Sequence, residues 1–132
     1  MSESKGVVLI VEDEVRILRF LRMAIRLVGY EVETAMGGED ALRLASLAEP
    51  DIVLLDMLMF PMDGFEVLRR LRAVSKVPVI AMSAFDSARQ ESMKLGADVF
   101  LRKPFRPEEV VREIEIILAS RILNGPPLAL AH

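Results

Sequence analysis

Five short hydrophobic runs alternate along this chain with segments of helical periodicity. Two runs, Val7–Val11 and Ile52–Leu55, are continuously apolar and rich in branched residues. Such runs are typical of strands that are buried on both faces of a parallel sheet. The others are Val77–Met82, Asp98–Leu101 and Tyr30–Ala35. The last alternates apolar and polar residues, which predicts a strand nearer the sheet edge.

Apolar residues recur every three or four positions in five further segments, which predicts five amphipathic helices. We expect them at Val15–Val28, Glu39–Ala48, Phe65–Val74, Asp86–Leu95 and Pro107–Leu123. Asp86 is the expected N-cap of the fourth helix, and Gly96 its terminator.

The first predicted helix carries a stripe of arginines at helical spacing: Arg16, Arg19, Arg22 and Arg26. We interpret this arginine stripe as a solvated face. The alternative is a docking surface for an acidic partner.

Strict alternation of strands and helices with short connections predicts an α/β fold, a parallel sheet covered by helices on both faces. A closed barrel would need roughly 250 residues, and this chain has 132. An open, doubly wound sheet is therefore expected. We expect one domain at residues 1–123, followed at 124–132 by a C-terminal tail or the start of a linker.

Composition narrows the class of protein. The chain is 52% hydrophobic and 28% charged, has a net charge of -3, and contains no cysteine. The acidic balance argues against direct binding of nucleic acid, and the lack of cysteine excludes disulfides and thiolate metal sites. No apolar run approaches the length of about 18 residues that a membrane span needs. We expect a soluble cytoplasmic domain with no membrane contact.

Polar side chains follow the predicted strands where each one ends: Glu12 and Asp13, then Asp56, Ser83 and Lys103. The carboxyl ends of parallel strands share one edge, so these residues can converge. Two carboxylates 4 Å apart repel by about 4 kcal/mol at an effective dielectric constant of 20. Lys103 and a divalent cation would compensate, and Mg²⁺ suits so few protein ligands better than Ca²⁺. With Asp56 as the nucleophile, the site would receive a phosphoryl group.

Over residues 6–120 the sequence resembles the receiver domain of two-component response regulators. The resemblance rests on the order and spacing of Glu12-Asp13, Leu54-Leu-Asp56, Met62-Asp-Gly64, Ser83-Ala84, Gly96-Ala-Asp98 and Lys103-Pro-Phe105. It implies a flavodoxin-like sheet with strand order 2-1-3-4-5 and five helices. It also implies that Asp56 accepts a phosphoryl group from a sensor histidine kinase or a histidine phosphotransfer protein. The phosphorylated state would switch a protein-interaction face, so the domain is a signalling module and not an enzyme with a released product.

The same resemblance assigns roles to individual residues. Mg²⁺ would be bound by Glu12, Asp13, Asp56 and the backbone carbonyl of Leu58. The phosphoryl group would contact Lys103 and Ser83, and Ser83 and Phe100 would form the switch. A cis peptide bond is expected before Pro104.

Four positions depart from the usual pattern of that family. Glu12 stands where Asp is commoner, so its longer side chain is expected to hold the metal through water. Phe60 occupies the usual place of a proline, which comes one residue later as Pro61 and reshapes the loop after Asp56. Phe100 replaces a frequent tyrosine, and Phe85 predicts slow loss of the phosphoryl group.

Three alternatives remain beside the receiver hypothesis. The first is a pseudo-receiver, an interaction module that is not phosphorylated. A flavodoxin-like cofactor binder is disfavoured by the acids Glu12-Asp13-Glu14 in the loop after the first strand, and an aspartyl-phosphate hydrolase by Leu58, which stands where a general acid is needed. Downstream, we expect a partner protein or an output domain, and a phosphorylation-dependent homodimer is compatible with the sequence. Ile116 is a candidate contact residue.

Overall fold

The computed structural model describes residues 3–123, which form five strands and five helices in strict alternation. The strands are β1 Val7–Val11, β2 Glu31–Ala35, β3 Ile52–Asp56, β4 Val79–Ser83 and β5 Val99–Arg102. The helices are α1 Val15–Leu27, α2 Gly38–Ala48, α3 Gly64–Val74, α4 Ala88–Lys94 and α5 Pro107–Leu123.

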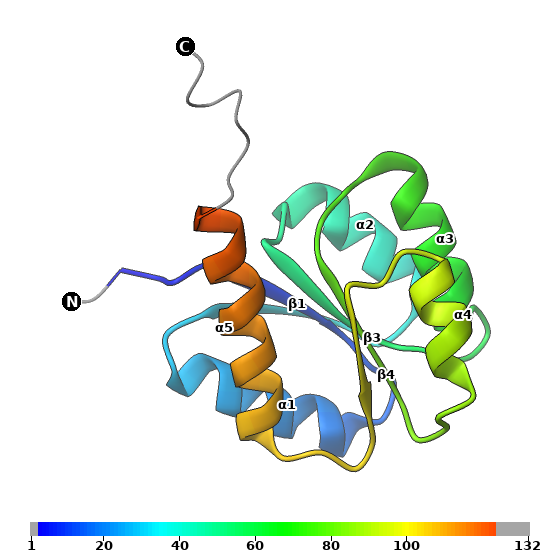
Figure 1. The fold of residues 1–132 in the computed structure, drawn as a ribbon, viewed down its shortest axis with the longest axis horizontal. Helices are drawn as coiled ribbons and strands as arrows, with labels where there is room; N and C mark the ends of the chain where they lie inside the picture. Colours follow the sequence, from blue (N-terminus) through cyan, green and yellow to red (C-terminus); the bar gives the residue numbers. More distant parts are fainter. Residues whose placement is uncertain (1–2, 124–132) are drawn as a thin grey trace.

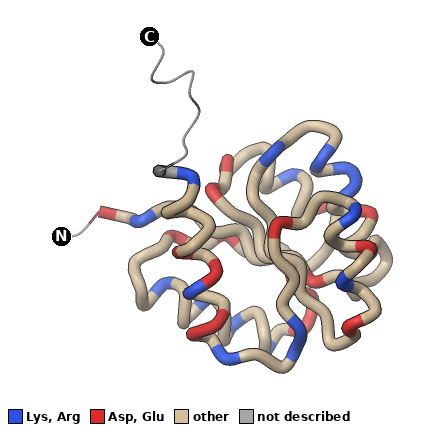
Figure 2. Tube along the Cα trace, viewed as in Figure 1, with Lys and Arg blue, Asp and Glu red and all other residues tan. Residues whose placement is uncertain are grey.

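All strands are parallel and lie in the order β2-β1-β3-β4-β5. The expected doubly wound fold is thereby confirmed, with β3 at the centre of the sheet (Figure 1). The central strands carry no charged residue until the carboxyl end of β3, whereas the helices and loops carry many (Figure 2). The apolar runs are therefore strands buried on both faces, as their composition predicts.

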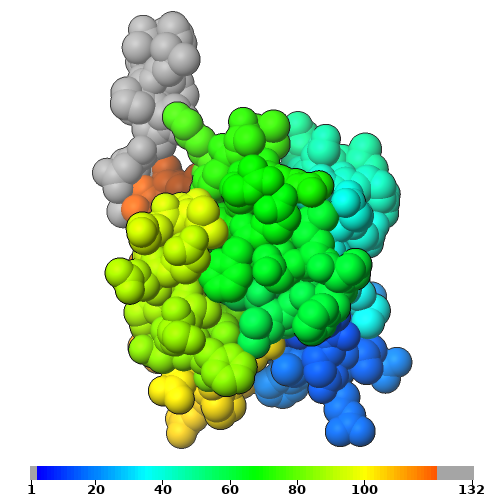
Figure 3. Space-filling view, turned by 90° about the vertical axis from the view of Figure 1, so that its right-hand side faces the viewer, coloured from blue at the N-terminus to red at the C-terminus, as the bar shows by residue number. Residues whose placement is uncertain are grey.

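Alternate residues of each strand point to opposite faces of the sheet and build two separate cores. On one face, Leu9 and Leu55 pack with residues of α2, α3 and α4 such as Leu68. On the other, Ile10 and Leu54 pack with residues of α1 and α5, among them Ile114. Burying each such side chain stabilises the fold by roughly 1.5–3 kcal/mol. Figure 3 shows the side of the molecule on which α3 and α4 lie next to one another.

The edge position predicted for the second strand is confirmed. In β2 the glutamates Glu31 and Glu33 are exposed, whereas Val32 and Thr34 are half-buried. Among residues 3–123, β2 pairs only with β1. The alternating pattern therefore reports a strand with one face in solvent.

The expected start of the fourth helix is wrong. Asp86 is not the N-cap of α4; Ser87 occupies that position, and its side chain makes no capping hydrogen bond. The Asp86 backbone carbonyl instead accepts from Arg89 N at 3.0 Å, and the Asp86 carboxylate forms an ion pair with the Arg89 guanidinium. Asp86 therefore lies within a tight turn before the helix. The helix ends at Lys94, and Gly96 follows with φ +107° as the expected terminator.

Surface predictions can be checked on the described part of the chain. The four residues of the arginine stripe are all exposed, and Ile116 is 54% exposed. Among residues 3–123, no helix combines the length and the apolar character that crossing a membrane requires. The predicted tail or linker at 124–132 lies outside the described residues.

Candidate functional site

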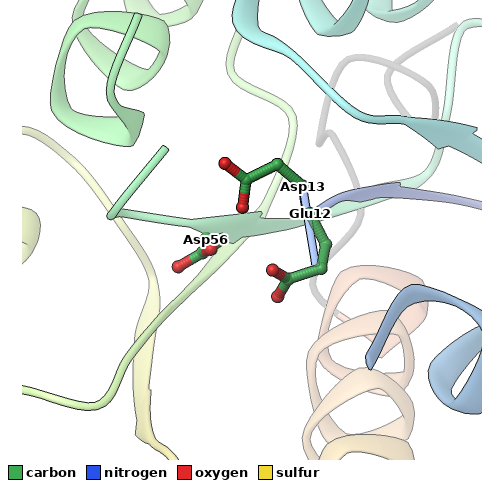
Figure 4. Close-up of side chains that lie close together, drawn as sticks. All are labelled: Glu12, Asp13 and Asp56. Atoms are coloured by element: carbon green, nitrogen blue, oxygen red, sulfur yellow. The ribbon is translucent and has the colours of Figure 1, made fainter. Parts of the chain in front are cut away.

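Three carboxylates from two neighbouring strands meet at the carboxyl edge of the sheet. Val11 of β1 pairs with Leu55 of β3, so the residues that follow them, Glu12 and Asp56, emerge side by side. Together with Asp13 they offer oxygen atoms that all lie within 4.8 Å of one another. Their side chains surround one small space (Figure 4). The predicted convergence of these acids is therefore observed.

The backbone holds two of these acids firmly. Glu12 N donates to Ala35 O at 3.0 Å, which extends the β1–β2 ladder past the end of β1. Asp56 is the last residue of β3, paired with Met82 of β4. Glu12 is 0% exposed and Asp56 4%, while Asp13 is exposed. Two charges are thus nearly removed from water, and the third faces solvent at the mouth of the site.

Lys103 is the cation beside these carboxylates. Its Nζ lies 2.7 Å from Glu12 Oε1 and 3.6 Å from Asp56 Oδ1. Its backbone N donates to Ser83 O at 2.8 Å, which fixes the loop after β5 to the end of β4. The Lys103–Pro104 peptide bond is cis, as expected. Lys103 therefore lies within reach of Asp56 but is bound more closely to Glu12.

The environment raises the pKa of Asp56 to about 7. Burial is the main cause, and the neighbouring Glu12 carboxylate adds to it. The Lys103 ammonium and the Leu58 backbone N–H, which donates to Asp56 Oδ1 at 3.2 Å, act in the opposite direction. Burial and the Glu12 carboxylate therefore outweigh the attraction of the Lys103 ammonium.

The loop after Asp56 is held against the strand by a glycine. Gly64 N donates to Met57 O at 3.0 Å, and a Cβ at Gly64 would lie 2.4 Å from Asp56 O. No side chain fits there, so α3 begins directly against the backbone of Asp56. Within this loop Phe60 is 86% exposed, and the Phe60–Pro61 bond is cis.

Leu58 is 48% exposed at the rim of the site. Its backbone N–H contacts the Asp56 carboxylate. The role expected for the Leu58 carbonyl as a metal ligand stays a prediction.

Ser83 lies at the end of β4 and is 0% exposed. Its Oγ accepts from Phe85 N at 3.0 Å, and no hydrogen bond within the described residues joins it to Asp56. Phe85 is 59% exposed, so its ring is a surface group and not part of the core. Ser83 therefore lies at the same edge of the sheet as the acids, as the sequence predicts.

Phe100 occupies a different place from the acids. It lies in β5, is 6% exposed, and packs in the core beneath α4 with Ala88 and Ala97. The Arg89 guanidinium lies over its ring, 4.7 Å from the ring centroid. The expected rotation of Phe100 between two positions stays a prediction; the position seen here is the buried one.

Sequence reasoning missed three contacts around the site. It did not pair Lys103 with Glu12, because side-chain direction after a strand end is not encoded in periodicity. It also missed Glu14 as the N-cap of α1, whose side chain accepts from Arg16 N at 2.7 Å. The third is the contact of the Arg89 guanidinium with the Phe100 ring. The available sequence signal was the three-residue spacing of Asp86 and Arg89, which allows their side chains to pair.

The charges of the site do not balance within the described residues. The three carboxylates carry a formal charge of -3 and Lys103 carries +1, which leaves -2. The three side chains offer carboxylate oxygens, the donors that hard divalent cations prefer. The site therefore fits one divalent cation beside Asp56.

Comparison with known sequences points to one family. Residues 8–115 match the family described as response regulator receiver domain. The protein named probable transcriptional regulator ycf27 from Cyanophora paradoxa is 38% identical over 131 residues, which are 98% of this chain and 54% of that protein. The alkaline phosphatase synthesis transcriptional regulatory protein PhoP of Bacillus subtilis (strain 168) is 34% identical, over 90% of this chain and 51% of that protein. The chain thus spans about half the length of these relatives.

Solved structures of similar shape agree with this result. The receiver domain of the Francisella response regulator 1452 matches with a TM-score of 0.81 and 30% identity, covering 85% of this chain and 95% of that one. The chemotaxis response regulator CheY4 of Vibrio cholerae matches with a TM-score of 0.80 and 30% identity, covering 88% and 99%.

Proposed function

The chain belongs to the response regulator receiver domains, and on that premise we propose that it accepts a phosphoryl group on Asp56 and thereby switches a protein-interaction face. The phosphodonor would be a phosphohistidine of a sensor histidine kinase or of a histidine phosphotransfer protein. The domain promotes its own phosphorylation and dephosphorylation, and its product is a signalling state.

One observation carries the proposal. Asp56 is a nearly buried carboxylate at the end of the central strand, with Lys103 Nζ 3.6 Å away and two further carboxylates within 4.8 Å. A structural acid would be expected to have its charge neutralised. Here the surroundings keep an excess of negative charge. Such an excess is typical of a site that binds a cation and, together with that cation, an anionic ligand.

Magnesium fits the residues present. Asp13 and Asp56 would hold it directly, and Glu12 through water, because both Glu12 oxygens already accept hydrogen bonds, one from Lys103 Nζ and one from Glu14 N. The backbone carbonyl of Leu58 is a further candidate ligand. When bound, Mg²⁺ would neutralise the charge that develops on the phosphoryl oxygens and lower the pKa of Asp56.

The transfer itself uses Asp56 as the nucleophile. One carboxylate oxygen forms the new O–P bond while the N–P bond of the phosphohistidine breaks. The electron pair of that bond stays on the imidazole nitrogen, which takes a proton from solvent. Lys103 would leave Glu12 and contact the transferred phosphoryl oxygens, since its Nζ is already within 3.6 Å of Asp56.

Ser83 would bind the transferred phosphoryl group. Its buried hydroxyl oxygen accepts from Phe85 N, which leaves the O–H to donate to a phosphoryl oxygen once the loop moves toward Asp56. Phe100 would take up the space that this movement opens, and the face of α4, β5 and α5 would change its partner preference.

The partners follow from the family. We expect a phosphohistidine-bearing protein as donor, and a downstream protein or an output domain as receiver of the signal. Both relatives named above are transcriptional regulators of about twice this length, so in this proposal residues 1–123 are the receiver domain. The arginine stripe and Ile116 are exposed and remain candidate contact surfaces, also for a phosphorylation-dependent homodimer.

Phosphorylation can be tested on the purified protein with Mg²⁺ and a small donor, either acetyl phosphate or phosphoramidate. The intact mass should rise by one phosphoryl group, and both Asp56→Asn and removal of Mg²⁺ with EDTA should abolish the rise. Asp40→Asn is the matched control, because Asp40 is an aspartate on α2 that pairs with Arg43 and is not one of the three clustered acids. No mass rise in the wild-type protein with either donor would contradict the proposal.

A pseudo-receiver is the second candidate function. Its support is the rim of exposed apolar side chains at the site, Leu58, Phe60 and Phe85, which suits a protein contact with or without phosphate. This candidate requires that neither phosphorylation nor Mg²⁺ binding is observed. Binding of Mg²⁺ to the wild-type protein, at a midpoint concentration that rises in Asp13→Asn, would contradict this candidate.

A further inference from the structure

A cation covers the buried aromatic ring of β5. Phe100 is 6% exposed, and the Arg89 guanidinium lies 4.7 Å from its ring centroid. A phenylalanine has no hydroxyl group, so packing and the face of its ring are all that can fix its position. A guanidinium over the face of an aromatic ring is attracted by the ring quadrupole. Arg89 therefore supplies the directional contact of this ring.

The other side of the same guanidinium is attached to the loop that carries Ser83. Arg89 Nε and Nη2 donate to Asp86 Oδ1 at 3.2 and 3.0 Å. Asp86 lies three residues after Ser83 in a loop closed by the bond from Ala88 N to Phe85 O at 3.1 Å. The side chains of Asp86 and Arg89 are more than half exposed, so this ion pair by itself adds little stability. Through this ion pair, however, Arg89 connects the loop after Ser83 with the ring of Phe100.

We propose that Arg89 is a positioning residue that couples the Ser83 loop to Phe100 through its ion pair with Asp86. This inference rests on the proposed function. Movement of Ser83 toward a phosphoryl group carries Asp86 with it. Arg89 must then follow Asp86 or release it, and either event changes its position over the ring. Arg89 in turn stabilises the buried position of Phe100, the position that phosphorylation is proposed to require.

The coupling has a thermodynamic consequence. If the buried position of Phe100 favours the phosphoryl group, a loss of Arg89 lowers the fraction of competent molecules and weakens binding of a phosphoryl mimic in proportion. A cation–π contact at a partly exposed site corresponds to about a three- to tenfold change in that midpoint.

The chain offers a matched control for Arg89. Arg43 forms the same three-residue ion pair with Asp40 on α2 and makes no ring contact within the described residues. Arg43→Met therefore removes a guanidinium–aspartate pair without touching an aromatic ring. Arg89→Met removes the charge over Phe100 and keeps an unbranched side chain. Arg89→Lys keeps a cation but loses the two guanidinium N–H donors that bind Asp86.

The experiment follows Phe100 by ¹⁹F NMR in protein labelled with 4-fluorophenylalanine, with the resonance assigned by Phe100→Leu. Each variant is titrated with beryllium fluoride, a mimic of the phosphoryl group, in the presence of Mg²⁺. Arg89→Met should shift the resting resonance and raise the midpoint about three- to tenfold. Arg89→Lys should recover part of both effects, and Arg43→Met should match the wild-type protein.

The outcomes separate the inference from the function on which it rests. Failure of the wild-type protein to gain a phosphoryl mass or to respond to beryllium fluoride overturns the proposed function. A wild-type response with an unchanged midpoint in Arg89→Met overturns the role of Arg89 alone. A lowered midpoint in that variant also overturns it, because Arg89 would then stabilise the resting state.

Discussion

Two carboxylates, Asp56 and Glu66, have pKa values that move in opposite directions. Glu66 on α3 accepts from Arg69 Nε at 2.9 Å and from Arg70 Nε at 2.7 Å, and these bonds lower its pKa to about 2. Asp56 is nearly buried beside Glu12, and its pKa is raised to about 7. Glu66 pairs with two guanidiniums, Arg69 and Arg70, the second of which also contacts Glu39. In contrast, Glu12 and Asp56 share the single ammonium of Lys103.

In the proposed function, the difference separates a charge that serves the structure, Glu66, from one that serves the chemistry, Asp56. Glu66 is satisfied within the chain and has nothing further to bind. Asp56 is held by a rigid strand in surroundings that disfavour its charge, so binding of Mg²⁺ or of a phosphoryl group brings a gain that the resting chain does not have. If this comparison is correct, the two sites must respond differently to mutation, pH and salt.

The largest difference between the Asp56 and Glu66 sites is expected when a cation beside each carboxylate is removed. Lys103→Met should slow phosphorylation of Asp56 by acetyl phosphate about 100- to 1000-fold, because one preorganised contact to the phosphoryl oxygens is lost. Arg69→Met, the matched loss on α3, should leave the rate unchanged. The measurement is the initial rate of mass increase. Equal rates in Lys103→Met and the wild-type protein would contradict the proposed role of Lys103.

A smaller effect is expected on stability, and its size depends on pH. The folded chain protonates Asp56 more readily than the unfolded chain, since its pKa rises from 3.8 to about 7. The free energy of unfolding of the wild-type protein therefore falls as pH rises through this window. Asp56→Asn removes the charge and should be more stable than wild type at pH 8 by about 1–3 kcal/mol.

Urea unfolding in EDTA at pH 8 and pH 5.5 measures this difference. At pH 5.5 the advantage of Asp56→Asn should shrink, because the wild-type carboxyl is then largely protonated in the folded state. Saturating Mg²⁺ at pH 8 should stabilise the wild-type protein more than the variant. An advantage that grows on acidification would show that the pKa of Asp56 is not raised.

The smallest effect is expected at Glu66. Its pKa is lowered, so its contribution to stability is fully present above its unfolded value of 4.5 and is lost only as pH falls toward 2. Glu66→Gln should therefore lower the thermal midpoint slightly and equally at pH 5.5 and pH 8. High salt should remove most of this effect, because the pair is solvent-screened. A strong pH dependence between these two values would break the contrast with Asp56.

Much of the fold was predictable from the sequence because its main signals are local. The runs Val7–Val11 and Ile52–Leu55 have no polar residue and can only be buried, and the alternation in β2 marks the sheet edge. The acids could be predicted to converge because topology alone brings strand ends together. The strand order came from the resemblance to receiver domains, since periodicity does not specify which strands pair.

The errors and omissions concern single side chains. Asp86 has the right residue type for an N-cap, but Arg89 one turn later competes for its carboxylate. Lys103 lies among the acids as expected, but its closer pairing with Glu12 than with Asp56 was not anticipated. Such choices depend on rotamers and on neighbours distant in sequence, which a pattern of apolar positions does not contain.

Because Gly64 has no side chain, the first turn of α3 lies directly against the Asp56 backbone and is sensitive to its position. Because this helix touches the main chain of Asp56 with no side chain between them, a displacement of that carboxylate's backbone has nowhere to be absorbed. Amide hydrogen exchange in the first turn of α3 should therefore change on phosphorylation, although no residue of that turn contacts the phosphoryl group in the proposed mechanism. In that sense the signal would also reach α3, which packs in the same core as Phe100.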